Sequence, residues 1–388
     1  MLPLNWQRVR LGDICEFGNG GAYETLIVEN GDFKLISLNS IDIDGNLKNT
    51  MKRVNFYDNS LKQDDIVMVL SDVAHGDFLG LCAVIPSNDY VLNQRMGRLR
   101  KRNDCINILF LRLYINANQK YFKMQGQGSS QLNLSKKAIE DFEILLPPLK
   151  EQIAIANILS GLDRYLCALD ALILKKESVK KALSFELLSQ RKRLKGFNQA
   201  WQKVRLGDIG KPCMCKRVMK HQTTRYGEIP FYKIGTFGNT ADAFISKKLF
   251  LEYQTKYSFP KKGDILISAS GTIGRAVIYD GKPAYFQDSN IVWIDNDETL
   301  VKNDFLFYAY SNVKWNTEHT TILRLYNDNF RNTLIPLPPL NEQIAIADIL
   351  SALDNEIISL KNKKRQFENI KKALNHDLMS AKIRVLKK

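Results

Sequence analysis

The sequence contains the same segment twice. Residues 146–163 read LPPLKEQIAIANILSGLD, and residues 337–354 repeat this string with only three changes. A second match, between residues 6–14 and residues 201–209, opens each half of the chain. Internal repeats set the architecture of a protein, and a period of about half the chain is far too long for a solenoid. The sequence therefore indicates a tandem duplication of one module.

The longer segments between these matches have diverged. They resemble each other only at scattered points, such as Asp65-Ile66 against Asp264-Ile265. A duplicated surface that stays the same suggests one kind of partner bound twice, whereas a duplicated surface that diverges suggests two different targets. The module therefore combines a constant part with a variable part.

Length and composition bound the class of protein. A chain of 388 residues is long enough for two or three domains, and 45% hydrophobic and 25% charged residues are ordinary for a globular protein. No apolar run approaches the roughly 18 residues that span a bilayer, and residues 1–5 lack the features of a secretion signal, so we expect a cytoplasmic protein. The net charge of +15 favours a polyanionic partner, although lysine-rich helix faces on any basic protein would give the same charge.

The sequence shows no pattern of a catalytic or metal site. Its six cysteines are dispersed, and Cys213-Met214-Cys215 lacks a second pair or a nearby histidine at zinc spacing, so we expect reduced core thiols and no bound metal. There is no phosphate-binding loop of an ATP motor, no dinucleotide fingerprint and no Asn/Asp-Pro-Pro-aromatic motif of an amino-methyltransferase. The four histidines are scattered. We therefore expect a binding protein that is not an enzyme and needs no cofactor.

Each repeat leads into a long helix. After Pro148 and Pro339, apolar residues recur at alternating steps of three and four, which is the a/d seam of a coiled coil. Proline is tolerated in the first turn of a helix, and none occurs further along, so we predict helices over about 150–190 and 341–382. At ~1.5 Å per residue each would be about 60 Å long. Because each seam needs a cover, we expect an antiparallel pair whose outer faces bind a further protein.

Four lysines interrupt the predicted seam, at positions 176, 180, 364 and 371. A lysine at such a position extends to solvent, sets the register of the pair, or contacts another protein or DNA. The sequence leaves these three roles open.

The diverged segments read as mixed α/β. Short runs rich in β-branched residues predict strands at 65–70, 79–85, 264–268 and 273–279. Apolar runs predict helices at 110–115 and 305–310, and Asp-Gly pairs predict hairpins at 44–46 and 280–282. Each segment is long and apolar enough to fold on its own.

Polar loops between these elements carry side chains suited to reading base edges and phosphates. Any one of them could be an ordinary surface turn, but similar loops recur in both halves. The candidate DNA-binding residues are Asn93, Gln94, Arg95, Gln127, Ser129, Ser130, Gln131, Ser268, Ser270, Thr272, Arg275, Gln287, Thr321 and Arg324.

These features together make the chain resemble, over its full length, the DNA specificity (S) subunits of type I restriction-modification enzymes. The resemblance rests on Leu-Pro-Pro-Leu-x-Glu-Gln-Ile before each helix, Trp-x-x-Val-x-Leu-Gly-Asp-Ile opening each half, the segment 263–274, and Asn-Gln-Arg at 93–95. The first half departs from the family pattern at residues 71–76, where the Ser-Gly-Thr-Ile-Gly loop of the second half is not repeated.

The resemblance implies an α+β fold with a pseudo-two-fold repeat, in which two target-recognition domains are separated by two long antiparallel coiled-coil helices. The expected segments are a first recognition domain at 1–145, a central helix at 146–195, a second recognition domain at 196–336 and a C-terminal helix at 337–388. Each recognition domain would read one half of a bipartite, asymmetric site in double-stranded DNA.

The resemblance also implies partners. The repeats would dock two copies of a DNA methyltransferase subunit, and a restriction subunit with motor and nuclease activity can join. S-adenosylmethionine and ATP would then belong to those partners. The residues expected to contact a partner are Glu151, Gln152, Ile155, Glu342, Gln343 and Ile346.

Two other classes of protein fit part of the sequence. One is the recognition region of a fused nuclease-methyltransferase, which the complete two-fold repeat disfavours. The other is a coiled-coil adaptor without a DNA role, which does not explain why only the globular parts diverged. Methyltransferase copurifying at two copies per chain would decide between these alternatives.

Overall fold

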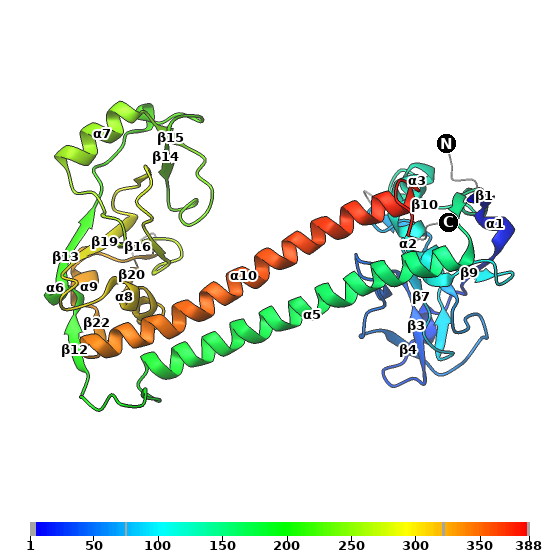
Figure 1. The fold of residues 1–388 in the computed structure, drawn as a ribbon, viewed down its shortest axis with the longest axis horizontal. Helices are drawn as coiled ribbons and strands as arrows, with labels where there is room; N and C mark the ends of the chain where they lie inside the picture. Colours follow the sequence, from blue (N-terminus) through cyan, green and yellow to red (C-terminus); the bar gives the residue numbers. More distant parts are fainter. Residues whose placement is uncertain (1–4, 74–75, 320–322, 386–388) are drawn as a thin grey trace. The chain divides into compact units, whose positions relative to one another are not determined.

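The computed structural model describes residues 5–73, 76–319 and 323–385. The chain divides into two compact units (Figure 1). Unit 1 comprises residues 1–170 and 363–388, and unit 2 comprises residues 171–362. The boundaries fall within the two long helices, so each unit contains one globular part and a portion of both helices.

Unit 1 contains an antiparallel four-stranded sheet and a mixed three-stranded sheet. The four-stranded sheet has the order β2 (Cys15–Asn19), β9 (Met96–Lys101), β5 (Ile66–Val69), β7 (Cys82–Val84), and the three-stranded sheet has the order β4 (Lys52–Val54), β3 (Phe33–Ile36), β8 (Tyr90–Leu92). Two short pairs join β1 (Gln7–Arg10) to β11 (Glu143–Leu146) and β6 (Ser71–Val73) to β10 (Gln131–Asn133). The helices are α1 (Leu11–Ile14), α2 (Ile108–Ala117), α3 (Gln119–Gln125) and α4 (Lys136–Glu140), with 3-10 turns at Glu24–Leu26 and Leu38–Ser40.

Unit 2 repeats this plan with different residues. Its four-stranded sheet has the order β13 (Gly210–Met214), β19 (Ile291–Asn296), β16 (Ile265–Ser268), β17 (Ala276–Ile278), and its three-stranded sheet has the order β15 (Phe244–Ile245), β14 (Ile229–Tyr232), β18 (Tyr285–Phe286). Two short pairs join β12 (Gln202–Arg205) to β22 (Leu334–Leu337) and β20 (Glu318–His319) to β21 (Leu323–Arg324). The helices are α6 (Leu206–Ile209), α7 (Lys247–Lys256), α8 (Asn303–Tyr310) and α9 (Asn327–Asn332), with a 3-10 turn at Lys220–Gln222.

The correspondence between the units extends to strand direction. In each three-stranded sheet one pair is parallel, β3 with β8 and β14 with β18, and all other named pairs are antiparallel. The duplicated module therefore keeps the order and strand directions of its four-stranded and three-stranded sheets while its side chains differ.

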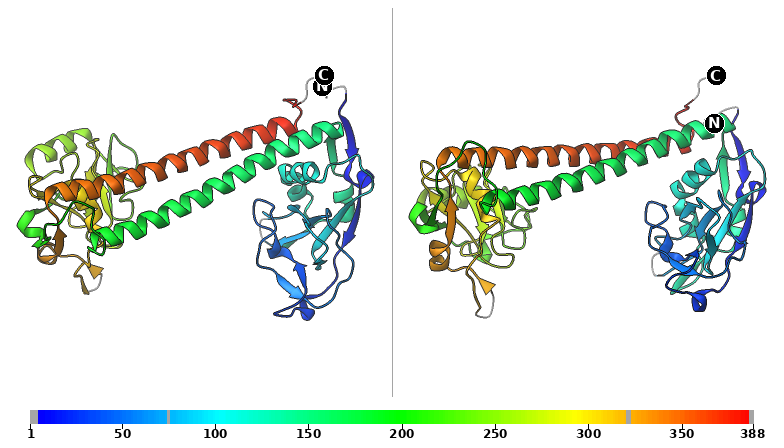
Figure 2. Two further views of the ribbon diagram at one scale, coloured as in Figure 1. Left: turned by 60° about the horizontal axis from the view of Figure 1, so that its bottom comes forward. Right: turned by 90° about the horizontal axis from the view of Figure 1, so that it is seen from below.

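The two long helices have equal length. Helix α5 (Leu149–Leu188) and helix α10 (Leu340–Met379) each contain 40 residues and follow the Pro-Pro pairs directly (Figure 2). Their first turns close on the prolines, since the N–H groups of Glu151 and Glu342 donate to the carbonyls of Pro148 and Pro339 at 2.8 and 2.9 Å. The sequence prediction placed both starts within a residue or two of these bounds.

Within each unit the two helices run antiparallel. In unit 1, Tyr165 of α5 packs on Phe367 of α10 with ring centroids 4.7 Å apart. In unit 2, Lys176 of α5 pairs with Glu356 of α10 at 2.8 Å. Within unit 1, Asp163 and then Asp170 pair with Lys371 and then Lys364. Within unit 2, Lys176 and then Lys180 pair with Glu356 and then Asp354, so residue numbers rise along α5 as they fall along α10.

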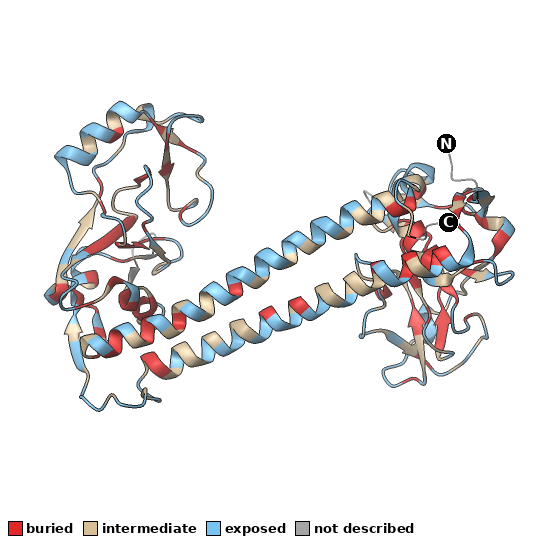
Figure 3. Ribbon diagram, viewed as in Figure 1, coloured by how far each residue is buried: buried red, intermediate tan, exposed pale blue. Residues whose placement is uncertain are grey.

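The core of each unit joins the sheet to the ends of both helices, as the buried residues in Figure 3 show. In unit 1, Leu159 of α5 and Leu378 of α10 pack with Phe110, Phe122 and other apolar side chains of the globular part. The equivalent cluster in unit 2 contains Leu187, Leu188, Ile346 and Leu350 of the helices, together with Phe305 and Phe330. Full burial of one such side chain contributes about 1.5–3 kcal/mol, so the helix ends are integral to each core.

One sequence prediction is wrong in detail. The Asp-Gly turn at residues 280–282 does connect two strands, and Gly281 has φ +84°. Strands β17 and β18 on either side of it belong to different sheets, however, so the segment is a crossover turn and not a hairpin. An Asp-Gly pair specifies a tight turn but not the partner of the strand that follows.

Candidate nucleic-acid interface

Both predicted polar segments of unit 1 lie at one end of its four-stranded sheet. Strand β5 ends at Val69, which pairs with Met96 at the start of β9, and the Asn93–Arg95 turn immediately precedes β9. Past Val69 the chain enters β6, which pairs with β10. Strand β10 begins at Gln131, directly after the 127–130 loop. The topology therefore brings the turn and the loop to the same edge of the module.

The residues of the Asn93–Arg95 turn have different roles. Asn93 is only 2% exposed, and its side-chain oxygen accepts a hydrogen bond from the N–H of Tyr23 at 3.1 Å. Arg95 adopts φ +67°, a conformation that non-glycine residues seldom take, and its side chain is exposed. Gln94 is half-buried, and its N–H donates to the carbonyl of Gly21 at 2.6 Å. Asn93 therefore fixes the turn, and Arg95 is the member that a ligand can reach.

The loop before β10 is a small, exposed hairpin. Gln127 and Asn133 exchange two backbone hydrogen bonds, of 3.0 and 2.9 Å, and Gly128 has φ +125°. Gln127, Ser129 and Ser130 are exposed, whereas Gln131 is half-buried within β10. This loop presents hydroxyl and amide donors at the same end of the sheet as Arg95.

In unit 2 the predicted serines are structural. Ser268 and Ser270 are 2% and 7% exposed. The Ser268 hydroxyl donates to the Thr272 carbonyl and accepts from the Arg275 N–H at 3.0 Å, so it shapes the loop that carries exposed Thr272. The Nη1 group of Arg275 donates to the Phe237 carbonyl at 2.9 Å, and the Arg275 side chain is exposed.

The turn before β19 matches the Asn93–Arg95 turn of unit 1. The side-chain oxygen of Gln287 accepts from the N–H of Ile234 at 3.0 Å, and Ser289 has φ +58°. The next residue, Asn290, accepts from the Ser270 hydroxyl at 2.7 Å and from Nη2 of Arg324 at 3.0 Å. The predicted residues Ser270, Gln287 and Arg324 thus gather around one turn. Thr321 lies outside the described residues.

This turn forms one wall of a pocket of 430 Å³ in unit 2. Cationic side chains line it at Arg217, Lys220, Lys233 and Arg324, together with amides at Gln287 and Asn290. Sequence reasoning missed Arg217, Lys220 and Lys233, although the basic run from Lys216 to Lys220 was a signal for them. A concave surface lined by cations and amides suits the phosphates and base edges of a nucleic acid.

The six residues predicted to contact a partner are buried. Glu151, Gln152, Ile155, Glu342, Gln343 and Ile346 are each no more than 1% exposed. In this structure these side chains contact their own unit and present almost no surface to a partner. Their repetition in both modules has a structural reason.

The two glutamates tie each repeat to its own unit. Glu151 accepts from the indole N–H of Trp6 at 3.2 Å, and Glu342 accepts from the indole N–H of Trp201 at 2.9 Å. An arginine pairs with each carboxylate at 2.7 Å: Arg384 with Glu151 and Arg193 with Glu342. A buried carboxylate needs such partners, which explains why the tryptophan and glutamate motifs recur together.

The two glutamines link each repeat to the globular part of its unit. The side-chain oxygen of Gln152 accepts from the N–H of Asn107 at 2.8 Å, and its amide donates to the Cys105 and Pro147 carbonyls at 2.9 and 2.8 Å. Gln343 makes the matching set, with Lys302 N–H at 2.9 Å and the Leu300 and Pro338 carbonyls at 3.0 and 2.9 Å. Each glutamine thereby anchors the loop before α2 or α8.

The four seam lysines set the register of the helix pair. Each forms an ion pair with a carboxylate of the other long helix: Lys176 with Glu356, Lys180 with Asp354, Lys364 with Asp170, and Lys371 with Asp163. Of the three roles that the sequence left open, this one is observed. Such half-exposed pairs add little stability, but they exclude other registers.

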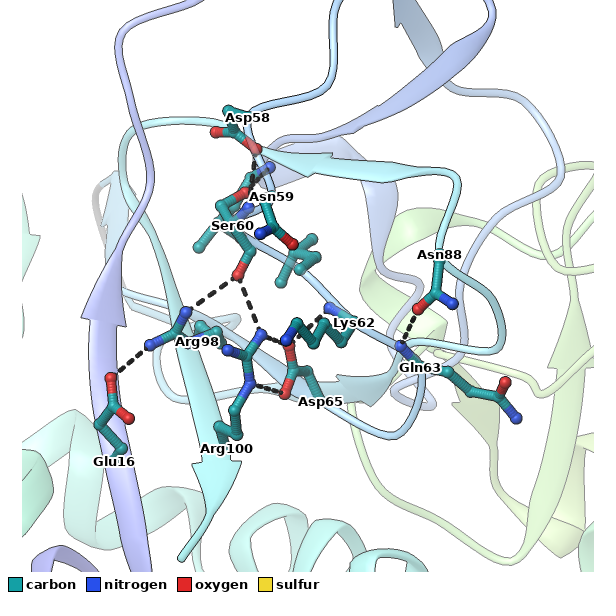
Figure 4. A network of polar contacts seen from close by, with 12 residues as sticks. Glu16, Asp58, Asn59, Ser60, Lys62, Gln63, Asp65, Asn88, Arg98 and Arg100 are labelled. Atoms are coloured by element: carbon teal, nitrogen blue, oxygen red, sulfur yellow. Dashed lines mark hydrogen bonds and ion pairs between the residues drawn. The ribbon is translucent and has the colours of Figure 1, made fainter.

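A second polar network in unit 1 lies under strand β9 (Figure 4). Asp65 is 2% exposed and receives two hydrogen bonds from Arg100, of 2.8 and 2.6 Å. Arg98 donates to Glu16 at 2.7 Å and to the Ser60 carbonyl at 3.0 Å. These pairs link β9 to β2 and to the segment that precedes β5.

Unit 2 lacks the arginine of this network. Asp264, which matches Asp65, is 6% exposed and accepts from the Lys261 N–H at 2.7 Å. Burial raises the pKa of the Asp264 carboxyl above its ordinary value, and the nearby negative charge of Asp295 adds to the rise. Asp65 of unit 1 is thus paired with an arginine, whereas burial disfavours the charged form of Asp264 at the same position of unit 2.

In the described ranges, no group of three or more His, Cys, Asp and Glu side chains is arranged to hold a metal ion. None of the described helices is both long and apolar enough to cross a membrane.

Comparison with solved structures bears on the fold. A type I restriction-modification S subunit from M. genitalium covers 97% of this chain and 96% of its own, with a TM-score of 0.63 and 16% identity. A chain from a study of complex assembly and conformational transition of the type I restriction-modification system covers 98% of each, with a TM-score of 0.58 and 16% identity. The predicted α+β fold class is confirmed by this likeness.

Sequence relatives bear on the family. A candidate type I restriction enzyme specificity subunit of Haemophilus influenzae is 44% identical over 265 residues, which are 64% of this chain and 67% of the relative. The specificity subunit of the MjaVIII type I restriction enzyme of Methanocaldococcus jannaschii is 25% identical over 413 aligned residues, covering 99% of this chain and 94% of the relative. The family of the type I restriction modification DNA specificity domain matches twice, at residues 3–177 and 198–369. The chain therefore belongs to the type I restriction-modification DNA specificity family, as a specificity subunit with two copies of its domain.

Proposed function

We propose that this chain recognises a bipartite, asymmetric site in double-stranded DNA, with each unit reading one half-site. One observation carries the proposal: the corresponding ends of the two four-stranded sheets, one in each unit, carry different side chains. The turn there reads Asn93-Gln94-Arg95 in unit 1 and Gln287-Asp288-Ser289 in unit 2. Phosphate contacts position a protein on DNA, and contacts with base edges specify the sequence. A constant backbone with varied polar side chains fits both tasks.

The test is an exchange of the first recognition segment. Residues 1–145 are replaced by the same region of a related specificity subunit, and the methylated sequence is mapped after expression with the methyltransferase. One half of the recognised sequence should change while the other half stays the same. A change in both halves, or in neither, would show that the units are not independent readers.

We further propose that each repeat docks one methyltransferase subunit through its exposed residues. Ile153 and Ile344 are 41% and 40% exposed at equivalent positions, although both are apolar. Asn157 and Asp348 lie one turn further on and are exposed on the same face. These residues take the place of the buried ones that the sequence suggested, and they make two matching surfaces on one chain.

The mass of the reconstituted complex tests this docking. Two methyltransferase subunits should bind per wild-type chain, and the Ile153→Asp variant should retain one. Leu174→Asp serves as the control, because Leu174 is 63% exposed on α5 outside the repeat. A wild-type chain that saturates with a single methyltransferase would contradict the proposal.

In this proposal the chain itself carries out no chemistry. Methyl transfer, with its S-adenosylmethionine, and ATP-driven restriction belong to the partner subunits. The chain contributes the choice of sequence and the geometry in which the partners meet it.

A further inference from the structure

Arg217 in unit 2 is held in a defined orientation by Asp288. Its Nε group donates to a carboxylate oxygen of Asp288 at 2.9 Å. The Asp288 side chain is 14% exposed, whereas the Arg217 side chain is 67% exposed. Among the described residues, Arg217 makes its hydrogen bond through Nε and none through its two Nη groups. One edge of the guanidinium is therefore fixed to the protein, and the other edge is free.

Arg217 belongs to the lining of a pocket that is rich in cationic side chains. Arg217 and Asp288 line the 430 Å³ pocket together with Lys220, Lys233 and Arg324. Asp288 is the one carboxylate among these lining residues, and Arg217 offsets its charge. An anion or a carbonyl-rich surface would be favoured there, which agrees with DNA as the ligand.

Unit 1 has no cationic side chain at the place of Arg217, where its residue is Ala22. The segment after β2 contains Gly20 and Gly21, and a Cβ atom on Gly20 would lie 2.0 Å from the carbonyl oxygen of Asn93. The segment after β13 in unit 2 is the equivalent one, since Asn19 pairs with Gly97 and Met214 pairs with Val292 at the ends of matching ladders. Counting on from these pairs, Cys215 and Lys216 stand where unit 1 has Gly20 and Gly21, and Arg217 stands where unit 1 has Ala22.

The two units therefore supply an arginine from different segments, unit 1 from the turn and unit 2 from the segment after β13. In unit 1 the turn supplies Arg95, and the facing segment is glycine that packs closely against the turn. In unit 2 the equivalent turn supplies the carboxylate of Asp288, and the facing segment supplies Arg217. A carboxylate in a DNA-binding turn repels phosphates, and pairing with Arg217 offsets this repulsion.

We propose that Arg217, positioned by Asp288, reads a guanine in the half-site bound by unit 2. This inference rests on the proposed function and adds a specificity-determining residue to it. The planar guanidinium can donate two hydrogen bonds from its free edge to O6 and N7 of guanine in the major groove. Holding Nε to Asp288 fixes the plane of the group before DNA binds, so less side-chain entropy is lost on binding.

The experiment selects sequences from a randomised duplex DNA library with the full chain assembled with its methyltransferase. The Arg217→Lys variant keeps the positive charge but loses the planar pair of donors. Preference for guanine at one position of one half-site should fall roughly 10-fold or more. The other half-site and the salt dependence of non-specific binding should not change, because the number of cations is the same.

Variants of Asp288 test its positioning role. Asp288→Asn removes the charge that orients Arg217, and guanine preference should weaken at the same position, whereas Asp288→Glu should restore part of it. Arg205→Lys is the matched control. Arg205 is an exposed arginine of the same unit, at the end of β12, and it is not among the residues that line the pocket. Thermal unfolding of each variant should match that of the wild type, which excludes misfolding as the cause.

The possible contrary outcomes are distinct. A uniform loss of affinity for all sequences in Arg217→Lys would make Arg217 a phosphate contact and overturn base reading. An unchanged selected sequence would reduce the Arg217–Asp288 pair to an ordinary surface ion pair. If the wild-type complex enriches no sequence at all, the proposed function itself fails.

Discussion

Arg384 forms a two-pronged ion pair with Glu151, in which Nε and Nη2 of the arginine donate to the carboxylate at 3.1 and 2.7 Å. Arg193 and Glu342 repeat this arrangement at 2.9 and 2.7 Å. Arg193 follows the end of α5 and binds the start of α10, whereas Arg384 follows the end of α10 and binds the start of α5. In each unit, therefore, the start of one long helix is bound by an arginine that follows the end of the other long helix.

Replacement of either glutamate should destabilise one unit. Glu151→Ala leaves the indole N–H of Trp6 without its acceptor, and Trp6 is 5% exposed. We expect a loss of about 1–3 kcal/mol in the free energy of unfolding of unit 1, since an unsatisfied buried donor costs that much. Urea unfolding monitored by hydrogen exchange reports the stability of each unit individually. Glu342→Ala should lower the free energy of unfolding of unit 2 instead. Equal shifts of both units in each variant would contradict this assignment.

The seam ion pairs should behave as a register device. Lys371→Glu places like charges beside Asp163 and should lower the stability of the helix pair by about 1 kcal/mol. The double variant Lys371→Glu with Asp163→Lys should recover most of that loss. A double-mutant cycle by thermal unfolding measures the coupling, and absence of recovery would mean that the pair does not specify the register.

Amide substitution at the matched aspartates should have opposite effects in the two units. The folded state raises the pKa of Asp264, so ionisation of this group opposes folding as the pH rises above its unfolded value near 3.8. Asp264→Asn should therefore stabilise unit 2 at neutral pH, with a gain that vanishes as the pH falls below about 3.8. Asp65→Asn should destabilise unit 1, because Arg100 loses its charged acceptor. Unfolding measured from pH 3 to pH 8 checks both signs.

Arg95 is the best single candidate for base contact in unit 1, because its side chain is exposed at the turn. Arg95→Ala should cost roughly 1–3 kcal/mol in specific binding and relax one base position if the contact with guanine is bidentate. Sequence selection from a randomised library measures the effect, with Asn93 left intact to hold the turn. A uniform loss over all sequences would identify a phosphate contact instead.

The unread gap between half-sites should depend on helix length. Four residues inserted after residue 170 and four after residue 362 add about 6 Å of axial rise to both long helices, at the boundaries of the two units. Base pairs are ~3.4 Å apart along a strand, so the preferred gap should grow by just under two pairs. Four residues nearly preserve the facing of the seam, whereas two would rotate it by about 200° and disrupt pairing. Methylation mapped on targets that differ only in gap length checks this, and an unchanged gap would mean that the helices do not measure distance.

The sequence by itself determined the duplication, the α+β class and the two long helices. Repeats and the heptad seam are local patterns, and Pro148 and Pro339 mark the helix starts without reference to the rest of the chain. The polar turns were also visible, and Arg95 remains an exposed candidate.

Only the tertiary structure decided which repeated or polar residues are accessible. Glu151 and Gln152 have the composition of a binding motif, yet burial against Trp6 and Arg384 makes them structural, and that burial depends on residues far away in the chain. Arg217 became a candidate only because folding places it beside Asp288. Sequence patterns report side-chain chemistry and local spacing, whereas exposure and long-range pairing arise from the packing of segments that the sequence keeps apart.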